Sequence, residues 1–238
     1  LVNASYNSVN TGGAPNAFSE ISGHPDSKWG GSVMAALQIK NIPTGPGDDL
    51  KIDVSYAKGN TKNVISTSGG SPSFAMFGGT DRIGAYQSIG FGQTSDAVFL
   101  PGFLTGGATG DIKLTEAWGV RGAFNHNWDP FWSTSLWGSY AGVRYNGDAF
   151  DILSAKGQFC ASFNFGKALS ADYSCNPDFN IAQVGMVTRW TPVKNLTFSA
   201  EVMWFHLDQK MSGSSVFTAT APKPTAFYEF KDQDTVAL

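Results

Sequence analysis

Charged and amide side chains recur at every second position of several segments, and these are the residues of the chain that could do chemistry. Side chains two positions apart on a β-strand point to the same face, so such residues would share one polar surface. Charges on a surface that faces water attract or repel ions and polar solutes. The candidates for this role are Gln38, Lys40, Lys51, Asp53, Lys113, Arg121, Arg144, Arg189, Glu201, Glu229 and Lys231.

Three arginines among these candidates fall on consecutive predicted strands. We therefore expect Arg121, Arg144 and Arg189 to form a basic strip on one wall, although their distances from the turns suggest different heights. For each candidate taken alone, the alternative is an ordinary solvated charge at a water-facing position.

Catalytic and metal-binding chemistry has little support in the sequence. His24, His126 and His206 lie in unrelated contexts, with no Ser or Cys in a nucleophile motif nearby. The glycine-rich stretches GGSP and TGGATG lack the Lys-Ser/Thr that follows a phosphate-binding loop. The formal net charge is −3, and Lys and Arg form no cluster that would bind nucleic acid. We expect no enzymatic activity, no cofactor, no metal site and no nucleic-acid partner.

The two cysteines, Cys160 and Cys175, lie in one segment that is otherwise rich in Gly, Ser, Asn and Asp. A bridge between them would close a loop of roughly 15 residues and restrict the unfolded chain by about 3 kcal/mol. Such a bridge would indicate an oxidising compartment, such as the periplasm or the cell surface. The alternative is a pair of free thiols in a loop.

Three stretches that share one design must position these residues. Residues 29–57, 113–145 and 179–208 each read as an alternating strand, a turn that contains proline, and a second alternating strand. Long segments rich in Gly, Ser, Thr, Asn and Pro separate them, at 58–111, 146–178 and 209–226. The apolar patches FAMFGG and DAVFLPGFL within 58–111 fit either short strands or a folded loop over the rim. With partial strands near 1–7 and 227–238, about eight strands are predicted.

The composition favours strands that cross a membrane. The chain is 42% hydrophobic, yet its mean hydropathy is slightly negative and no run approaches the ~20 apolar residues of a membrane helix. Strands of a transmembrane barrel need only ~9–11 residues and alternate between lipid and water. Short turns that alternate with long loops are also typical of such barrels. We therefore predict an all-β, antiparallel transmembrane β-barrel, with the polar candidates facing its lumen.

Aromatic residues beside the ends of the predicted strands suit the two membrane interfaces. The girdle at the turn side would consist of Trp128, Phe131, Trp132 and Trp190, and the outer girdle of Tyr56, Trp204 and Tyr228. The alternative is core packing in a soluble, secreted β-sandwich that binds ligands as a lectin does. Folding as a monomer without detergent would favour that sandwich.

Three stretches carry a resemblance to a known family. They are KWGGSVMAALQIKNIPTGPGDDLKIDVSYAKG, LTEAWGVRGAFNHNWDPFWSTSLWGSYAGVRYNG and CNPDFNIAQVGMVTRWTPVKNLTFSAEVMWFHL. In order, spacing and turn residues they resemble the porins of rhizobial-type alphaproteobacteria, over most of residues 24–210.

The resemblance implies a sixteen-stranded barrel, a homotrimer in the outer membrane with its lipid and lipopolysaccharide, and passive diffusion of small hydrophilic solutes and ions. It also implies that Cys160 and Cys175 pair within one extracellular loop. Two departures from the family are expected to matter. The chain ends at Leu238 and not at an aromatic residue, and we find no inward-folded constriction loop in it. We therefore expect the C-terminal half of a porin, exported by a signal peptide outside this chain.

Overall fold

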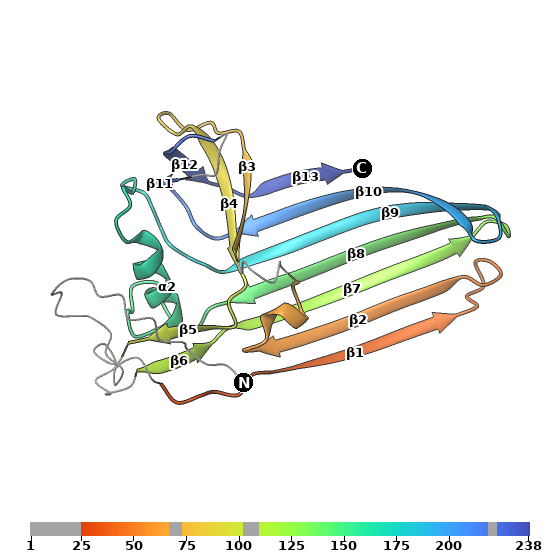
Figure 1. Cartoon of the computed structure of the whole chain (residues 1–238), viewed down its shortest axis with the longest axis horizontal. Coiled ribbons are helices and arrows are strands. Elements are labelled where there is room, and N and C mark those ends of the chain that lie inside the picture. Colours follow the sequence, from red (N-terminus) through yellow and green to blue (C-terminus); the bar gives the residue numbers. More distant parts are fainter. Residues whose placement is uncertain (1–24, 67–72, 102–109, 219–222) are drawn as a thin grey trace.

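A seven-stranded antiparallel sheet dominates the computed structural model, which describes residues 25–66, 73–101, 110–218 and 223–238 (Figure 1). Its strands alternate in direction, and short turns join β1 to β2, β7 to β8 and β9 to β10. In spatial order they are β1 (Gly31–Lys40), β2 (Asp49–Lys58), β7 (Glu116–Asn127), β8 (Trp132–Arg144), β9 (Phe179–Val193), β10 (Leu196–Gln209) and β13 (Gln233–Ala237).

The short turns share one end of the sheet and the long connections share the other (Figure 1). Residues in the short turns explain why the chain reverses direction there. Asp129 accepts hydrogen bonds from the backbone N–H groups of Phe131 (2.7 Å) and Trp132 (2.9 Å), which fixes the β7–β8 turn. Asn195 adopts a positive φ of 71° in the tight β9–β10 turn, a conformation that Asn tolerates better than most residues. We call these two ends the turn end and the loop end.

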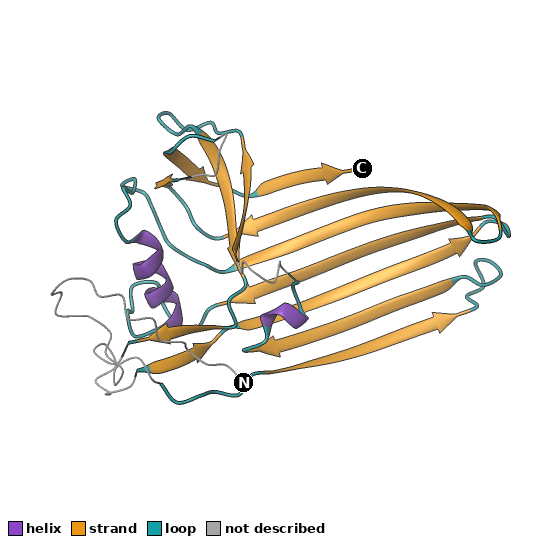
Figure 2. Ribbon diagram, in the orientation of Figure 1, coloured by secondary structure: helices purple, strands orange, loops and turns teal. Residues whose placement is uncertain are grey.

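Smaller elements cover the loop end (Figure 2). A four-stranded sheet has the order β11 (Ser214–Phe217), β12 (Ala226–Phe230), β4 (Gln87–Gln93) and β3 (Ser73–Gly78), and its β12–β4 pair is parallel. Next to it lie the β5–β6 pair (Ala97–Leu100 and Asp111–Leu114), the short helix η1 (Thr61–Asn63) and the helix α2 (Ala155–Asn164). Ser154 caps α2, because its side chain accepts a hydrogen bond from the Gly157 N–H at 3.0 Å. We call this set of elements the loop layer.

The described parts of the long segments contain more secondary structure than their composition indicates. The apolar patches of segment 58–111 contribute strands β3 and β5, although residues 102–104 of the second patch lie outside the described residues, and the helix α2 was not anticipated. The strand expected at 227–238 is in fact two strands, β12 in the loop layer and β13 in the large sheet. The partial strand expected at 1–7 lies outside the described residues, as does His24.

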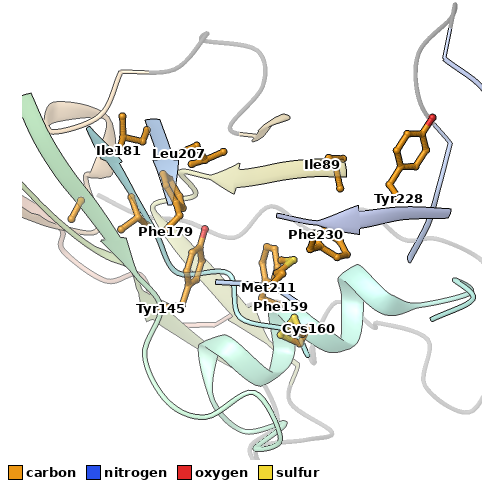
Figure 3. Packing of buried hydrophobic residues seen from close by; sticks show 13 residues of the cluster. Ile89, Tyr145, Phe159, Cys160, Phe179, Ile181, Leu207, Met211, Tyr228 and Phe230 are labelled. Carbon is orange, nitrogen blue, oxygen red and sulfur yellow. A yellow bond between two sulfur atoms is a disulfide. The ribbon is translucent and has the colours of Figure 1, made fainter. Parts of the chain in front are cut away.

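The hydrophobic core lies where the loop layer meets the large sheet (Figure 3). Phe179 and Leu207, from β9 and β10, are completely buried there, and the Phe74 ring contacts Phe179 edge-on at 5.6 Å. The loop layer contributes Ile89 and Tyr228, which are also completely buried. Every residue of β1, at the edge of the large sheet, is exposed.

The predicted fold class, all-β with antiparallel strands, is confirmed. The described strands do not close into a barrel, because β1 and β13 each pair with one neighbour only. No helix in the described ranges is long and apolar enough to cross a membrane.

Candidate functional site

The two faces of the large sheet differ in chemistry, and the strand register shows which residues share a face. Val54 lies opposite Ala35 on one side and Val120 on the other, and Met186 lies between Leu136 and Val202. These rows extend one apolar surface across six strands. We call it the apolar face.

Large apolar side chains on this face are between 36% and 65% exposed. They are Val33, Leu37, Ile39, Ile52, Val54, Val120, Leu136, Val184, Met186, Val202 and Val236. A soluble protein rarely leaves so wide an apolar patch open to water. A soluble sandwich would cover this face with a second sheet, but the other described sheets lie at the loop end and pack against the opposite face. The apolar face is therefore suited to lipid.

Aromatic rings border the apolar face at both ends. Near the turn end, the Trp132 and Trp190 rings stack with their centroids 5.7 Å apart, and the Trp190 and Phe198 rings stack with their centroids 5.6 Å apart. Near the loop end, Trp118 and Tyr140 contact each other at 5.5 Å. Trp118, Tyr140 and Phe198 were not among the predicted girdle residues, although the strand alternation places all three on this face.

The aromatic residues predicted to form the girdles differ in their exposure. Six of them are at least 40% exposed, which leaves them available to an interface: Tyr56, Trp128, Phe131, Trp132, Trp190 and Trp204. Tyr228 has no exposed surface, because it packs in β12 against Phe77 and Tyr86 within the loop layer. Its assignment to the outer girdle was wrong.

The opposite face, which we call the polar face, carries seven of the eleven candidate residues. They are Gln38, Lys40, Lys51, Asp53, Arg121, Arg189 and Glu201. Opposite charges pair there, both between neighbouring strands and along β2. The Arg121 Nε donates to an Asp53 carboxylate oxygen at 2.8 Å, and Asp49 accepts from Gln38 at 2.7 Å and contacts the Lys51 ammonium at 3.2 Å. Asp49, which also belongs to this face, was not among the predicted residues.

Further along the polar face, the charges bind neutral partners. Arg189 donates to the Ser135 hydroxyl at 2.8 Å, and Ser135 donates in turn to Asn125 at 2.8 Å. The Trp137 indole N–H donates to Glu201 at 3.1 Å. Charges and polar groups therefore line this face from the turn end to the middle of the sheet.

Arg144 does not lie on the polar face. It shares its phase along β8 with Leu136 and Tyr140, so it belongs to the outward side at the loop end. Its guanidinium donates there to Asn180 Oδ1 and to the Phe179 carbonyl. The expected basic strip of Arg121, Arg144 and Arg189 is therefore wrong.

Three more candidates lie in the loop layer and not on the wall of the large sheet. Lys113, in β6, pairs with Asp111 at 2.7 Å. Glu229, in β12, accepts a hydrogen bond from Thr80, and Lys231 follows β12 and contacts Asp81 at 3.2 Å. Their polar contacts lie within the loop layer, so their expected place on the wall is corrected.

A segment after β2 folds onto the polar face, which corrects the expectation that the chain lacks an inward-folded loop. It runs through η1 to Val64 and Ile65, and a Cβ placed on Gly119 of β7 would lie only 3.0 Å from Val64 Cγ1. Between this segment, β3 and the sheet lies a cavity of about 570 Å³. Its lining includes Ser55, Arg121, Ser139 and Gln183 from the polar face.

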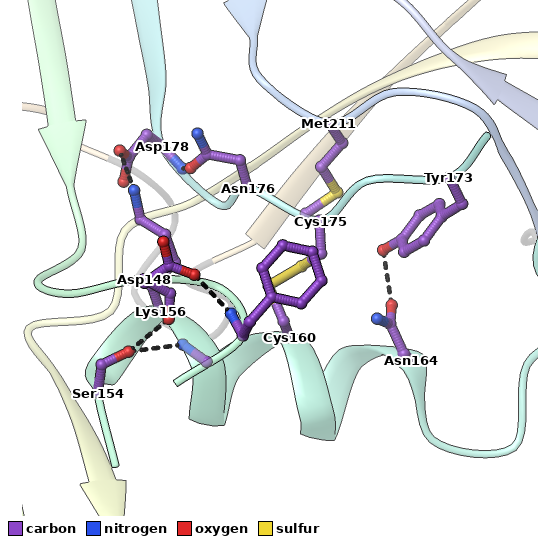
Figure 4. Close-up of a disulfide and its surroundings, with 12 residues drawn as sticks. Asp148, Ser154, Lys156, Cys160, Asn164, Tyr173, Cys175, Asn176, Asp178 and Met211 are labelled. Atoms are coloured by element: carbon purple, nitrogen blue, oxygen red, sulfur yellow. Dashed lines mark hydrogen bonds and ion pairs between the residues drawn. A yellow bond between two sulfur atoms is a disulfide. The ribbon is translucent and has the colours of Figure 1, made fainter. Parts of the chain in front are cut away.

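A disulfide joins Cys160 of α2 to Cys175 in the loop layer (Figure 4). Nearby, the Tyr173 hydroxyl donates to Asn164 at 2.6 Å, and the Lys156 ammonium contacts Asp178 at 2.7 Å. Burial raises the pKa of Tyr173 to about 12. The bridge therefore fixes α2 to the chain that leads into β9.

At the turn end, Asp48 is a buried carboxylate. It accepts hydrogen bonds from the Thr44 hydroxyl (2.6 Å) and the Asn127 backbone N–H (2.9 Å), and contacts His126 Nδ1 at 2.6 Å. The hydrogen bond from Thr44 contributes most to lowering the pKa of Asp48 to about 2. His126 thus has a structural partner that ties the β1–β2 turn to the end of β7.

These charged and apolar residues form two surfaces on opposite sides of one sheet. Within the described part of the chain, no group of three His, Cys, Asp or Glu side chains could hold a metal ion. The sheet separates an apolar face from a face that is charged from the turn end to the middle and carries the buried core at the loop end.

Comparison with known proteins agrees with this arrangement. No curated protein and no solved structure matches the chain. A family model described as porin subfamily matches residues 6–238, nearly the whole sequence. The chain therefore belongs to the porin subfamily, a family of outer-membrane proteins.

Proposed function

We propose that this chain forms the wall of a water-filled channel through which small hydrophilic solutes and ions diffuse passively across the outer membrane. The observation that carries the proposal is the division of one sheet into an apolar and a polar face. Strands of this length span the hydrocarbon layer, and their cross-strand ladders satisfy the backbone inside it. The polar face then lines the channel, and the protein needs no catalytic residues.

The charges on the polar face are nearly balanced, which predicts weak ion selectivity. Four cations (Lys40, Lys51, Arg121 and Arg189) oppose three anions (Asp49, Asp53 and Glu201) on the described strands. A wall with rings of one sign would instead select strongly for the opposite charge. General diffusion is therefore favoured over transport of one ion type.

Charged residues on the outward side at the loop end suit contact with lipopolysaccharide. Lys58 pairs with Glu116 at 2.8 Å beyond the aromatic border, and Arg144 lies in the next strand of the same row. Cations at this height can pair with anionic head groups, while lipid tails cover the apolar face. A homotrimeric assembly is supported by the resemblance to rhizobial-type porins.

The test is conductance of the full-length protein in a planar lipid bilayer. Stepwise, ohmic current is expected, with a small reversal potential in a salt gradient. The variant Arg121→Glu should shift that potential towards cation selectivity, because Arg121 faces the channel. The matched control Arg144→Glu should leave it unchanged, because Arg144 faces outward. Absence of stepwise current would overturn the channel, and an equal shift in both variants would overturn the assignment of the two faces.

A further inference from the structure

We propose that Trp137, Glu201 and Arg189 form a subsite on the polar face that binds small zwitterions with a quaternary ammonium group, the betaines. This inference rests on the proposed function and names one class of solute for the channel. The three residues come from β8, β10 and β9, and the strand register places all three on the polar face, between the middle of the sheet and the turn end.

The Trp137 ring occupies space that small neighbours leave free. The residues opposite it are Ala123 on β7 and Gly185 on β9. A Cβ placed on Gly185 would lie 2.5 Å from Trp137 Cζ2 and 2.6 Å from its Cε2, so the indole lies directly over this glycine. The side chain is only half-buried, which leaves part of its π surface open to the lumen. Among the aromatic side chains, indole attracts ammonium groups most strongly.

The Glu201 carboxylate lies at the edge of this ring. The indole N–H of Trp137 donates to Glu201 Oε1 at 3.1 Å, which holds the carboxylate beside the ring. Glu201 is exposed, and no cationic side chain of the described residues lies within 4.0 Å of its carboxylate. A cation over the ring therefore meets a negative charge that no ion pair compensates. Weakly hydrated N-methyl groups can contact the ring directly, whereas a small inorganic ion keeps its water shell.

Arg189 supplies the opposite charge nearby. Ser199 lies opposite Arg189, so Glu201 is the diagonal neighbour of Arg189, with the two backbones about 7–8 Å apart. The two side chains diverge, because Arg189 donates to the Ser135 hydroxyl at 2.8 Å while Glu201 binds Trp137. A guanidinium has further N–H donors for a carboxylate. A betaine can therefore place its ammonium group beside the ring and Glu201, and its carboxylate on Arg189.

A second tryptophan–carboxylate pair, on the apolar face, lacks these features and provides the control. The Trp204 indole N–H donates to Asp234 at 3.0 Å, but Asp234 also contacts His206 Nδ1 at 2.9 Å. The His206 ring stacks on Trp204 with the centroids 5.6 Å apart. The ring and the carboxylate of this pair are thus both in contact with His206, and the pair faces the proposed lipid.

The experiment uses the full-length protein in maltoside micelles and saturation-transfer difference NMR, which detects binding without requiring conduction. The probe is glycine betaine, whose equivalent methyl protons give one sharp signal. We expect saturable transfer to these protons, with affinity in the millimolar range. Trp137→Leu, which removes the ring, and Glu201→Gln, which keeps the hydrogen-bond acceptor but removes the charge, should each weaken binding at least about fivefold. Trp204→Leu should bind betaine as the parent does.

Two further probes separate the charges of the ligand. In tert-butylacetate a carbon replaces the nitrogen of betaine, so it should bind at least about fivefold more weakly. Choline lacks the carboxylate, and Arg189→Gln should weaken the binding of betaine but not that of choline. No saturable betaine signal, equal affinity for tert-butylacetate, unchanged binding by Glu201→Gln, or an equal loss in Trp204→Leu would overturn the subsite.

Conductance of the same preparation in a planar bilayer distinguishes the failure of this inference from that of the proposed function. A protein that conducts but does not bind betaine refutes only the subsite. A protein that binds betaine without conducting refutes only the channel.

Discussion

The apolar and polar faces share the same strands and the same backbone hydrogen bonds, yet they meet different surroundings. On the apolar face, large aliphatic side chains remain exposed from β1 to β13, and the described loop layer does not cover them. On the polar face, charges pair across strands and along one strand, and apolar residues such as Phe179 and Leu207 are buried beneath the loop layer at the loop end. Because backbone pairing is common to both, the side chains alone decide which face meets lipid.

The largest expected effect comes from placing a charge on either face of one strand. Val202 and Met203 are neighbours in the middle of β10 and point to opposite faces. Val202→Arg should destabilise the protein by about 2–4 kcal/mol, because a cation at the membrane midplane loses its hydration. Met203→Arg should cost much less, since its side chain faces water. Urea unfolding of the protein refolded in lipid vesicles measures both. An equal loss of unfolding free energy in the two variants would contradict the assignment of one face to lipid and the other to water.

Removing the disulfide should affect only the side that the loop layer covers. Replacing Cys160 and Cys175 by Ser frees a loop with a separation of 15 residues, for which chain entropy predicts a loss of up to about 3 kcal/mol. We expect faster protease cleavage within 145–178. The unfolding of the large sheet in lipid should change little, because its ladders do not depend on the bridge. Unaltered cleavage of the double variant would show that packing around Phe159 and Met211 holds the loop layer without it.

The smallest effect concerns the turn end, where acidification should loosen the contact between the β1–β2 turn and β7. The pKa of Asp48 is lowered to about 2 in the folded protein, below its ordinary value of 3.8. The carboxylate therefore stabilises the fold fully above pH ~4, and this contribution is lost as the pH falls towards 2. The protection factor of the Asn127 amide against hydrogen exchange should fall over that range. Asp48→Asn should exchange faster at neutral pH and lose most of this pH dependence, and an unchanged profile would contradict the assignment.

The alternation of polar and apolar residues predicted the hairpins and most of the polar face, because successive side chains of a strand point to opposite faces of the sheet. Arg144 shows where this reasoning fails. Gly138 and Gly142 interrupt the pattern of β8, so its phase has to be taken from Leu136 and Tyr140, and that phase points Arg144 outward.

The loop layer could not be predicted from local pattern, since distant segments create it. Gln87 in β4 pairs with Tyr228 in β12, and Phe74 packs on Phe179. Tyr228 has the same sequence signature as an interface aromatic, and only these long-range contacts reveal that it is buried. The inward-folded segment leaves no periodic signal for the same reason, so the cavity residues Ser55, Ser139 and Gln183 were missed.

The central claim, that one face of the sheet meets lipid and the other meets water, is tested most directly by spin labels along β10. In a background with Cys160 and Cys175 replaced by Ser, single cysteines at positions 198–205 carry a nitroxide in the protein reconstituted in vesicles. Collision rates with oxygen, which concentrates in lipid, and with a water-soluble nickel complex are then measured at each position. We predict that oxygen access peaks at 198, 200, 202 and 204 and nickel access at 199, 201, 203 and 205. Access to both reagents without a period of two, or with the phases exchanged, would contradict the account.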